Sequence, residues 1–360
     1  CSGSQLCMQK KMELREKSES GQPTFMGIPM KWVSLLLLVL QTVGVVFAMR
    51  LSRTAVVSGP RYLNTTAVLF SELLKLLCSF LLLGRERGSI MSAATVVHQH
   101  LTGDCFETLK VTVPSLLYTV QNNLLFISLS NLSGAVYQVT YQLKILTTAI
   151  LSVLILGKEL GAVKWMALLI LTSGVALIQL PQGNSVAAHG NPVIGLCAVL
   201  SACVTSGLAG VYLEKILKQT DASIWLRNVQ LGLFGAIMGF IVCLGQDGAQ
   251  IREAGFTQGY NPLVWFVILL QAIGGLVVAA VLKYADNILK CFGNALSIVI
   301  SCVLSSLFLQ EFIPDIFFVL GTMLVILATS LYSLGLPDML LGKTDKSKDN
   351  AQNIQMSNKV

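Results

Sequence analysis

A lysine and two tyrosines stand at helical spacing in an otherwise apolar stretch of the chain. Tyr137, Tyr141 and Lys144 are separated by four and three residues, which places their side chains along one stripe of a helix. Tyrosine rings can stack on a nucleobase, and an ammonium group can bind a phosphate. The stripe is therefore typical of a nucleotide-binding wall, although tyrosines alone also serve as hydrogen-bonding contacts between membrane helices.

Two further groups of polar residues interrupt apolar stretches. Tyr118 and Asn122 lie four residues apart and would share one helical face. Asn287 and Lys290 belong to the string YADNILK, where a helix begins and its free N–H groups and dipole favour anions. Lys290 is a second candidate phosphate ligand. The alternative is that its side chain extends to the membrane interface.

Other polar residues of the apolar stretches have simpler interpretations. Glu72 and Lys75 are three residues apart, so their charges can neutralise each other and a structural ion pair is favoured. Ser206, in SGLAG, and Asn228, in WLRNVQ, are weaker candidates for binding, because small residues in those stretches also permit close helix packing.

The elements that must position these residues are membrane-spanning helices. Of the 360 residues, 54% are hydrophobic and 12% are charged, with a mean hydropathy of +0.72, which excludes an ordinary soluble protein and a nucleic-acid partner. About 20 apolar residues cross a hydrocarbon core about 30 Å thick. Ten stretches qualify, so we predict an all-α protein embedded in the lipid bilayer with ten spans: 32–49, 65–83, 111–130, 135–156, 163–180, 193–212, 223–244, 262–282, 291–309 and 314–334.

Charge and an internal repeat suggest the arrangement of the spans. Most of the 25 lysine and arginine residues fall at one side, which predicts that both termini face the cytosol. The strings LILGKEL (154–160) and LFLQEF (307–312) place Glu159 and Glu311 at short links between helices. Because five is an odd number, two five-span copies must be inverted relative to each other, as in secondary transporters that have a site near the midplane. The alternative is that the two strings are similar by chance.

These observations predict five segments. They are a polar cytosolic segment (1–31), a first repeat of five spans (32–180), a lumenal linker (181–192), a second repeat of five spans (193–334) and a disordered cytosolic tail (335–360).

Residue chemistry disfavours an enzyme. The nine cysteines lack paired ligand spacing, which argues against a disulfide framework and a zinc site. The sequence has no Walker loop, and His98, His100 and His189 all fall in predicted loops. We therefore expect no cofactor and no metal. A lysine from each half, with few buried carboxylates nearby, suits a solute carrying about two negative charges.

Several strings resemble one family of transporters. GPRYLNTTAV (59–68), PSLLYTVQNNLLFISLSNL (114–132), YQVTYQLKILTTA (137–149), GVYLEKILK (210–218) and KYADNILK (283–290) resemble the nucleotide-sugar transporters of the Golgi, in the drug/metabolite transporter superfamily. The likeness covers nearly all of 31–334. The string CFGNALS after Lys290 departs from the family pattern, which is closer to GFATSLS.

The resemblance implies a Golgi membrane protein that exchanges a cytosolic nucleotide sugar for a lumenal nucleoside monophosphate. It also implies that the lysines bind the phosphates within a site formed by Tyr118, Asn122, Tyr137, Tyr141, Lys144, Ser206, Asn228 and Lys290. A homodimer and an association with glycosyltransferases both stay open.

The resemblance further suggests which nucleotide is carried. The string NVQLGLFG resembles members that carry UDP-sugars, whereas CMP-sialic acid members have tyrosine in place of Gly232 and serine in place of Phe234. GPRYL and GYNPLVW (259–265) favour UDP-N-acetylglucosamine over UDP-galactose. The alternatives are a CMP-sialic acid/CMP antiporter, a metabolite exporter of the same fold and a membrane scaffold protein that transports nothing.

Overall fold

The computed structural model describes residues 24–25, 27–54, 62–103, 105–180, 191–219, 223–309 and 315–334. The predictions for most of the N-terminal segment, for 181–190 of the linker, for Glu311 and for the tail lie outside these residues.

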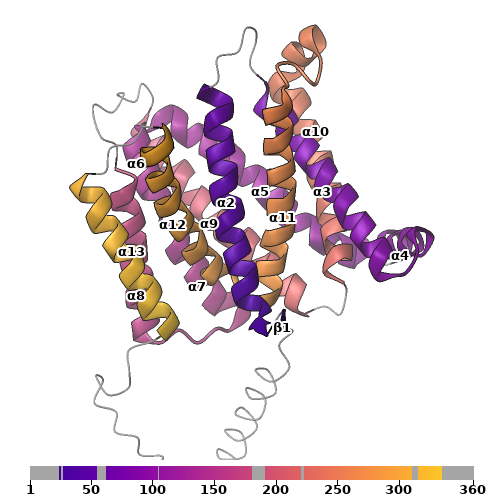
Figure 1. The fold of residues 1–360 in the computed structure, drawn as a ribbon. Helices are drawn as coiled ribbons and strands as arrows, with labels where there is room; N and C mark the ends of the chain where they lie inside the picture. The colour runs from indigo at the N-terminus through magenta and orange to yellow at the C-terminus, as the bar shows by residue number, and fades with distance from the viewer. Residues whose placement is uncertain are drawn as a thin grey trace, which may run out of the picture.

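Almost all of the described chain is helical (Figure 1). The exception is a short antiparallel hairpin of β1 (Thr24–Phe25) and β2 (Ile28–Pro29), which directly precedes the first helix. Apolar segments in lipid must satisfy their backbone hydrogen bonds internally, which a helix does. The helices are α2 (Met30–Thr54), α3 (Asn64–Glu86), α4 (Ile90–Thr102), α5 (Cys105–Asn131), α6 (Gly134–Tyr141), α7 (Lys144–Leu156), α8 (Ala162–Ile178), α9 (Pro192–Gln219), α10 (Ile224–Ala254), α11 (Pro262–Tyr284), α12 (Asn287–Leu304), the π-helix η1 (Ser305–Leu309) and α13 (Ile316–Leu334).

Helices occupy all ten segments that the sequence predicts to be spans. Within the described residues, eight helical segments are long and apolar enough to cross a membrane. The other two predicted spans coincide with α8, an apolar helix of 17 residues, and with α5, which carries Tyr118, Gln121, Asn122 and Asn123. The protein is therefore a nearly all-helical membrane protein.

The fourth predicted span is not continuous. The helix is interrupted at Gln142 and Leu143, between α6 and α7. Gln142 N–H donates to the Val139 carbonyl at 3.2 Å, and Leu143 N–H donates to the Thr140 carbonyl at 3.1 Å, so the chain winds more tightly here than an α-helix. The break lies inside the stripe that the sequence singled out.

The helices pack in a small set of pairs. α3 packs along α10, α8 along α13, and α9 against both α5 and α7. α2 stands between α11 and α12 (Figure 1). At the α8–α13 crossing, a Cβ built on Gly174 would lie 2.9 Å from the Gly321 carbonyl oxygen, so only glycine permits this backbone approach.

The predicted span 223–244 contains a buried arginine. Arg227 is in the first turn of α10. Ser223 caps the start of this helix, where its hydroxyl accepts a hydrogen bond from Trp225 N–H. The guanidinium is buried, and its Nη1 donates to Gln230 Oε1 at 3.0 Å. Arg227 is thus a buried, hydrogen-bonded residue of α10.

Candidate functional site

The predicted stripe of two tyrosines and a lysine forms a stacked group. The rings of Tyr137 and Tyr141 have centroids 5.8 Å apart and lie 9° from parallel. Lys144 Nζ stands 4.0 Å from the centroid of the Tyr141 ring, within the range of a cation–π contact. The break between α6 and α7 therefore preserves the alignment and places the lysine over the aromatic face.

Two neighbouring helices hold Tyr141 in place. Gln121 on α5 donates from Nε2 to the Tyr141 hydroxyl at 2.8 Å, and the Ser206 side chain on α9 is a second hydrogen-bond partner of that hydroxyl. The candidate residues Tyr141 and Ser206 are thus brought together. Gln121 was not among the predicted site residues, although an amide inside an apolar helix next to Asn122 was the signal that could have identified it.

The helix break is joined to α9. Cys203 Sγ donates to the Tyr141 carbonyl at 3.6 Å, and Thr147 Oγ1 donates to the Cys203 carbonyl at 3.0 Å. These contacts lie on either side of Lys144. The local geometry of the lysine is therefore fixed by α9, which comes from the other half of the chain.

The two candidate phosphate ligands act on each other. Lys290 lies close enough to Lys144 for the two charges to interact, and the Cys291 thiol lies beside both. Both lysine side chains are half-buried. Like charges repel at short range in a low-dielectric region, so a polyanion between the two ammonium groups would be bound by both.

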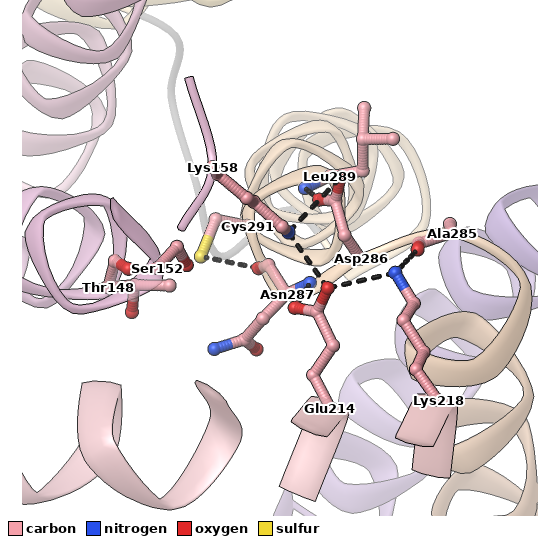
Figure 2. Close-up of polar contacts among 10 residues, drawn as sticks. All are labelled: Thr148, Ser152, Lys158, Glu214, Lys218, Ala285, Asp286, Asn287, Leu289 and Cys291. Carbon is pink, nitrogen blue, oxygen red and sulfur yellow. Dashed lines mark hydrogen bonds and ion pairs between the residues drawn. The ribbon is translucent and has the colours of Figure 1, made fainter. Parts of the chain in front are cut away.

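The N-terminus of α12 corrects one expectation. Its N–H groups were expected to be free for an anion, but carboxylates of the protein accept hydrogen bonds from two of them. Asn287 N–H donates to Glu214 Oε2 at 2.9 Å, and Leu289 N–H donates to Asp286 Oδ1 at 2.7 Å (Figure 2). The first turn is already capped, because Asp286 is an N-cap and Glu214 reaches it from α9. A role for Lys290 in binding a phosphate stays a prediction.

Comparison with known proteins identifies the chain. The family model described as nucleotide-sugar transporter matches residues 26–333, which is most of the chain. The chain belongs to the nucleotide-sugar transporter family. It is a transporter and not an enzyme.

Relatives of this transporter match over nearly their full length. It is 51% identical over 308 residues to a human protein named UDP-N-acetylglucosamine transporter, covering 84% of this chain and 95% of the relative. It is 48% identical over 309 residues to a bovine protein named UDP-galactose translocator, covering 85% of this chain and 78% of the relative. One solved crystal structure shares the fold with a TM-score of 0.61 at 14% identity, covering 84% of this chain and 96% of that chain.

Three predicted site residues of the transporter do not join the stack. Tyr118 is half-buried and Asn122 is exposed on α5, and within the described residues neither makes a hydrogen bond or ring contact. Asn228 is buried, and its Nδ2 donates to the Ile224 carbonyl of its own helix at 3.0 Å. A role for these three residues in substrate binding stays a prediction.

The predicted pair of Glu72 and Lys75 is confirmed. Lys75 Nζ lies 2.5 Å from Glu72 Oε2. The Glu72 carboxylate fills the space beside Gly235 of α10, and the Lys75 side chain fills the space beside Gly275 of α11. The pair therefore also packs α3 against two helices of the second half.

Proposed function

We propose that this transporter is an antiporter that exchanges a cytosolic UDP-sugar for lumenal UMP across the Golgi membrane. UDP-N-acetylglucosamine is the first candidate and UDP-galactose the second, as the names of its relatives suggest. The observation that carries the proposal is the approach of Lys144 and Lys290 from opposite halves, next to an aromatic stack. A diphosphate or monophosphate would bridge the lysines, and the tyrosines would border the nucleoside.

The pattern of helix packing supports a ten-span inverted repeat. If α2, α3, α5, α7 and α8 correspond in order to α9, α10, α11, α12 and α13, a twofold relation predicts equivalents for the most extensive helix contacts. The α5–α9 contact then corresponds to α11–α2, and α7–α9 corresponds to α12–α2, while α3–α10 and α8–α13 pair equivalent helices. All of these contacts are present, as expected for two halves that move about a shared site.

Orientation follows from the positive-inside rule. Lys158, Lys215, Lys218 and Lys283 all lie at or near helix ends of the proposed cytosolic side. Both termini would then face the cytosol.

Charge explains why such a carrier would exchange solutes. Without a substrate the charges of Lys144 and Lys290 repel each other, whereas UMP or the UDP-sugar would neutralise them. If only the substrate-loaded protein changes its orientation easily, transport in one direction is obligatorily coupled to transport in the other.

The packing of α10 against α3 requires a small residue at position 232. At Gly232, where CMP-sialic acid members have tyrosine, a Cβ would lie 3.2 Å from both Cα and Cβ of Leu76 on α3. A tyrosine side chain does not fit this helix approach without moving α3. The packing of residue 232 against α3 therefore differs from that of the CMP-sialic acid members.

A thermal-shift panel tests the proposal. A ligand that binds only the folded state stabilises it by RT ln(1 + [L]/Kd), which is about 2.7 kcal/mol at a hundredfold excess over Kd. We expect UMP to raise the melting temperature of the purified protein and CMP and GMP to do so much less. No shift with UMP or any UDP-sugar would overturn the proposal, and a shift with CMP alone would favour the CMP-sialic acid alternative.

A further inference from the structure

Four charged side chains cluster where the α7–α8 link, α9 and the α11–α12 link meet (Figure 2). Lys158 Nζ lies 2.8 Å from Glu214 Oε1 and 3.5 Å from Asp286 Oδ2. Lys218 Nζ lies 2.8 Å from Glu214 Oε1 and donates to the Ala285 carbonyl at 2.5 Å. We call Lys158, Glu214, Lys218 and Asp286 the charge cluster.

Glu214 is the centre of the charge cluster. Its side chain has an exposed fraction of 0%, and it accepts hydrogen bonds from Lys218 and from Asn287 N–H as well as pairing with Lys158. Two lysines balance two carboxylates, so the cluster is neutral as observed. Removing one cation would leave a net negative charge around a fully buried carboxylate, which is costly until water reaches it.

The charge cluster crosses between the two halves of the chain. Lys158 follows α7 in the first half, after Gly157 ends that helix in a left-handed conformation with φ of 65°. Glu214, Lys218 and Asp286 all belong to the second half. A movement of one half away from the other at this end must therefore separate Lys158 from its two carboxylates.

The charge cluster is also adjacent to the candidate substrate site. Asn287, which donates to Glu214, is the first residue of α12, and Lys290 follows within the same turn. Cys291 Sγ donates to the Asn287 carbonyl at 3.3 Å and lies between the cluster and Thr148 of α7 (Figure 2). The thiol is thus placed to report whether this end is open.

We propose that Lys158 is a latch that holds the cytosolic end of the transporter closed by pairing with Glu214 and Asp286. When the site opens to the cytosol, the latch releases, and water entering between the halves takes the place of Lys158 around the carboxylates. The inference rests on the proposed alternating-access function. It adds that the ion pairs of Lys158 set the equilibrium between the site open to the cytosol and the site closed to it.

Labelling of Cys291 tests the latch. Full-length protein in sealed vesicles, with the cytosolic face outside, is exposed to a negatively charged, membrane-impermeant thiol reagent, and modification of Cys291 is followed by mass spectrometry. We expect Lys158→Met to speed this labelling about tenfold, because loss of the ion pairs shifts the equilibrium toward the open state by about 1.4 kcal/mol. Lys158→Arg, which keeps the charge, should label like the wild type.

Matched controls separate a latch from general loosening. Lys215→Met removes a lysine next to Glu214 that lies outside the charge cluster and should leave labelling unchanged. Cys243, which is buried on α10, should stay unlabelled in every variant. Equal labelling of Cys291 in Lys158→Met and wild type, or parallel gains at Cys291 and Cys243, would overturn the latch.

A second variant covers the case in which Lys158→Met does not fold. Asp286→Asn removes one carboxylate of the latch, while asparagine still caps α12. It should speed labelling by a smaller factor, and an unchanged rate would contradict the proposal. The proposed function fails separately, through the absence of UMP-dependent stabilisation in wild-type protein, and that outcome leaves the labelling comparison intact.

Discussion

At the scale of single residues, Tyr141 supports Lys144 in two ways. Its ring lies under the ammonium group, and its hydroxyl is held by Gln121 and Ser206 from two other helices. The ring therefore keeps the charge of Lys144 inside the bilayer, and the hydroxyl fixes the ring.

Substitutions at Tyr141 should separate the ring from the hydroxyl. Tyr141→Leu removes the cation–π contact, worth about 0.5–2 kcal/mol, and should weaken UMP binding by about tenfold. Tyr141→Phe keeps the ring and loses the hydrogen bonds to Gln121 and Ser206, so it should weaken binding less. Titration of each purified variant with UMP measures the effect. Phenylalanine as damaging as leucine would contradict a role for the ring.

Periodicity was enough to predict the stripe of Tyr137, Tyr141 and Lys144, because these residues are neighbours in the sequence and the short break between α6 and α7 leaves them aligned. It could not predict that Gln121 and Ser206 bind the same hydroxyl, because that depends on how α5 and α9 approach α6. It also failed at the start of α12, where Glu214 from a distant helix occupies an N–H group expected to be free.

At the scale of helices, close approach of α8 and α13 depends on glycine. A Cβ on Gly321 would lie 2.7 Å from the Gly174 carbonyl oxygen and 2.7 Å from Ile178 Cγ1. These distances are below van der Waals contact, so the helices must separate if either glycine gains a side chain.

Gly321→Ala should therefore lower the melting temperature of the protein in detergent, at a cost of about 1–3 kcal/mol for overpacking. Gly245→Ala is the matched control, because Gly245 is also helical and has nothing within 4 Å of a built Cβ. The melting temperature of this control should stay the same or rise. Equal melting temperatures for the two variants would contradict the close crossing of α8 and α13.

The helix positions followed from the sequence, since apolar runs of about 20 residues have few other structures open to them in lipid. The interruption at Gln142 and Leu143 did not, because both residues are compatible with a continuous helix. The break is bonded to its surroundings: Gln142 Nε2 donates to Gln179 Oε1 at 2.9 Å, and Cys203 Sγ donates to the Tyr141 carbonyl. Tertiary contacts to α9 and to the end of α8 therefore accompany a local distortion that propensity does not indicate.

At the scale of the whole molecule, α7 and α12 connect the site to the charge cluster, because Lys144 begins α7 and Lys158 follows its end, while Lys290 lies one turn from Asp286. Lys144 and Thr148 are one turn apart on α7, and Lys290 and Asn287 are one turn apart on α12. A substrate that draws the two lysines together would move the same helices whose ends carry the latch. Phosphate binding would therefore be coupled to the orientation of the two halves.

The most direct test of the account is exchange of radiolabelled UDP-N-acetylglucosamine for UMP in proteoliposomes containing wild-type protein or Lys144→Ala. A charge-assisted hydrogen bond is worth about 1.5–3 kcal/mol, so the substitution should reduce exchange by at least about tenfold. Lys164→Ala, which changes a lysine that contacts the Tyr332 ring on the α8–α13 side, should retain exchange. Undiminished exchange by folded Lys144→Ala would contradict the claim that the two lysines bind the phosphates.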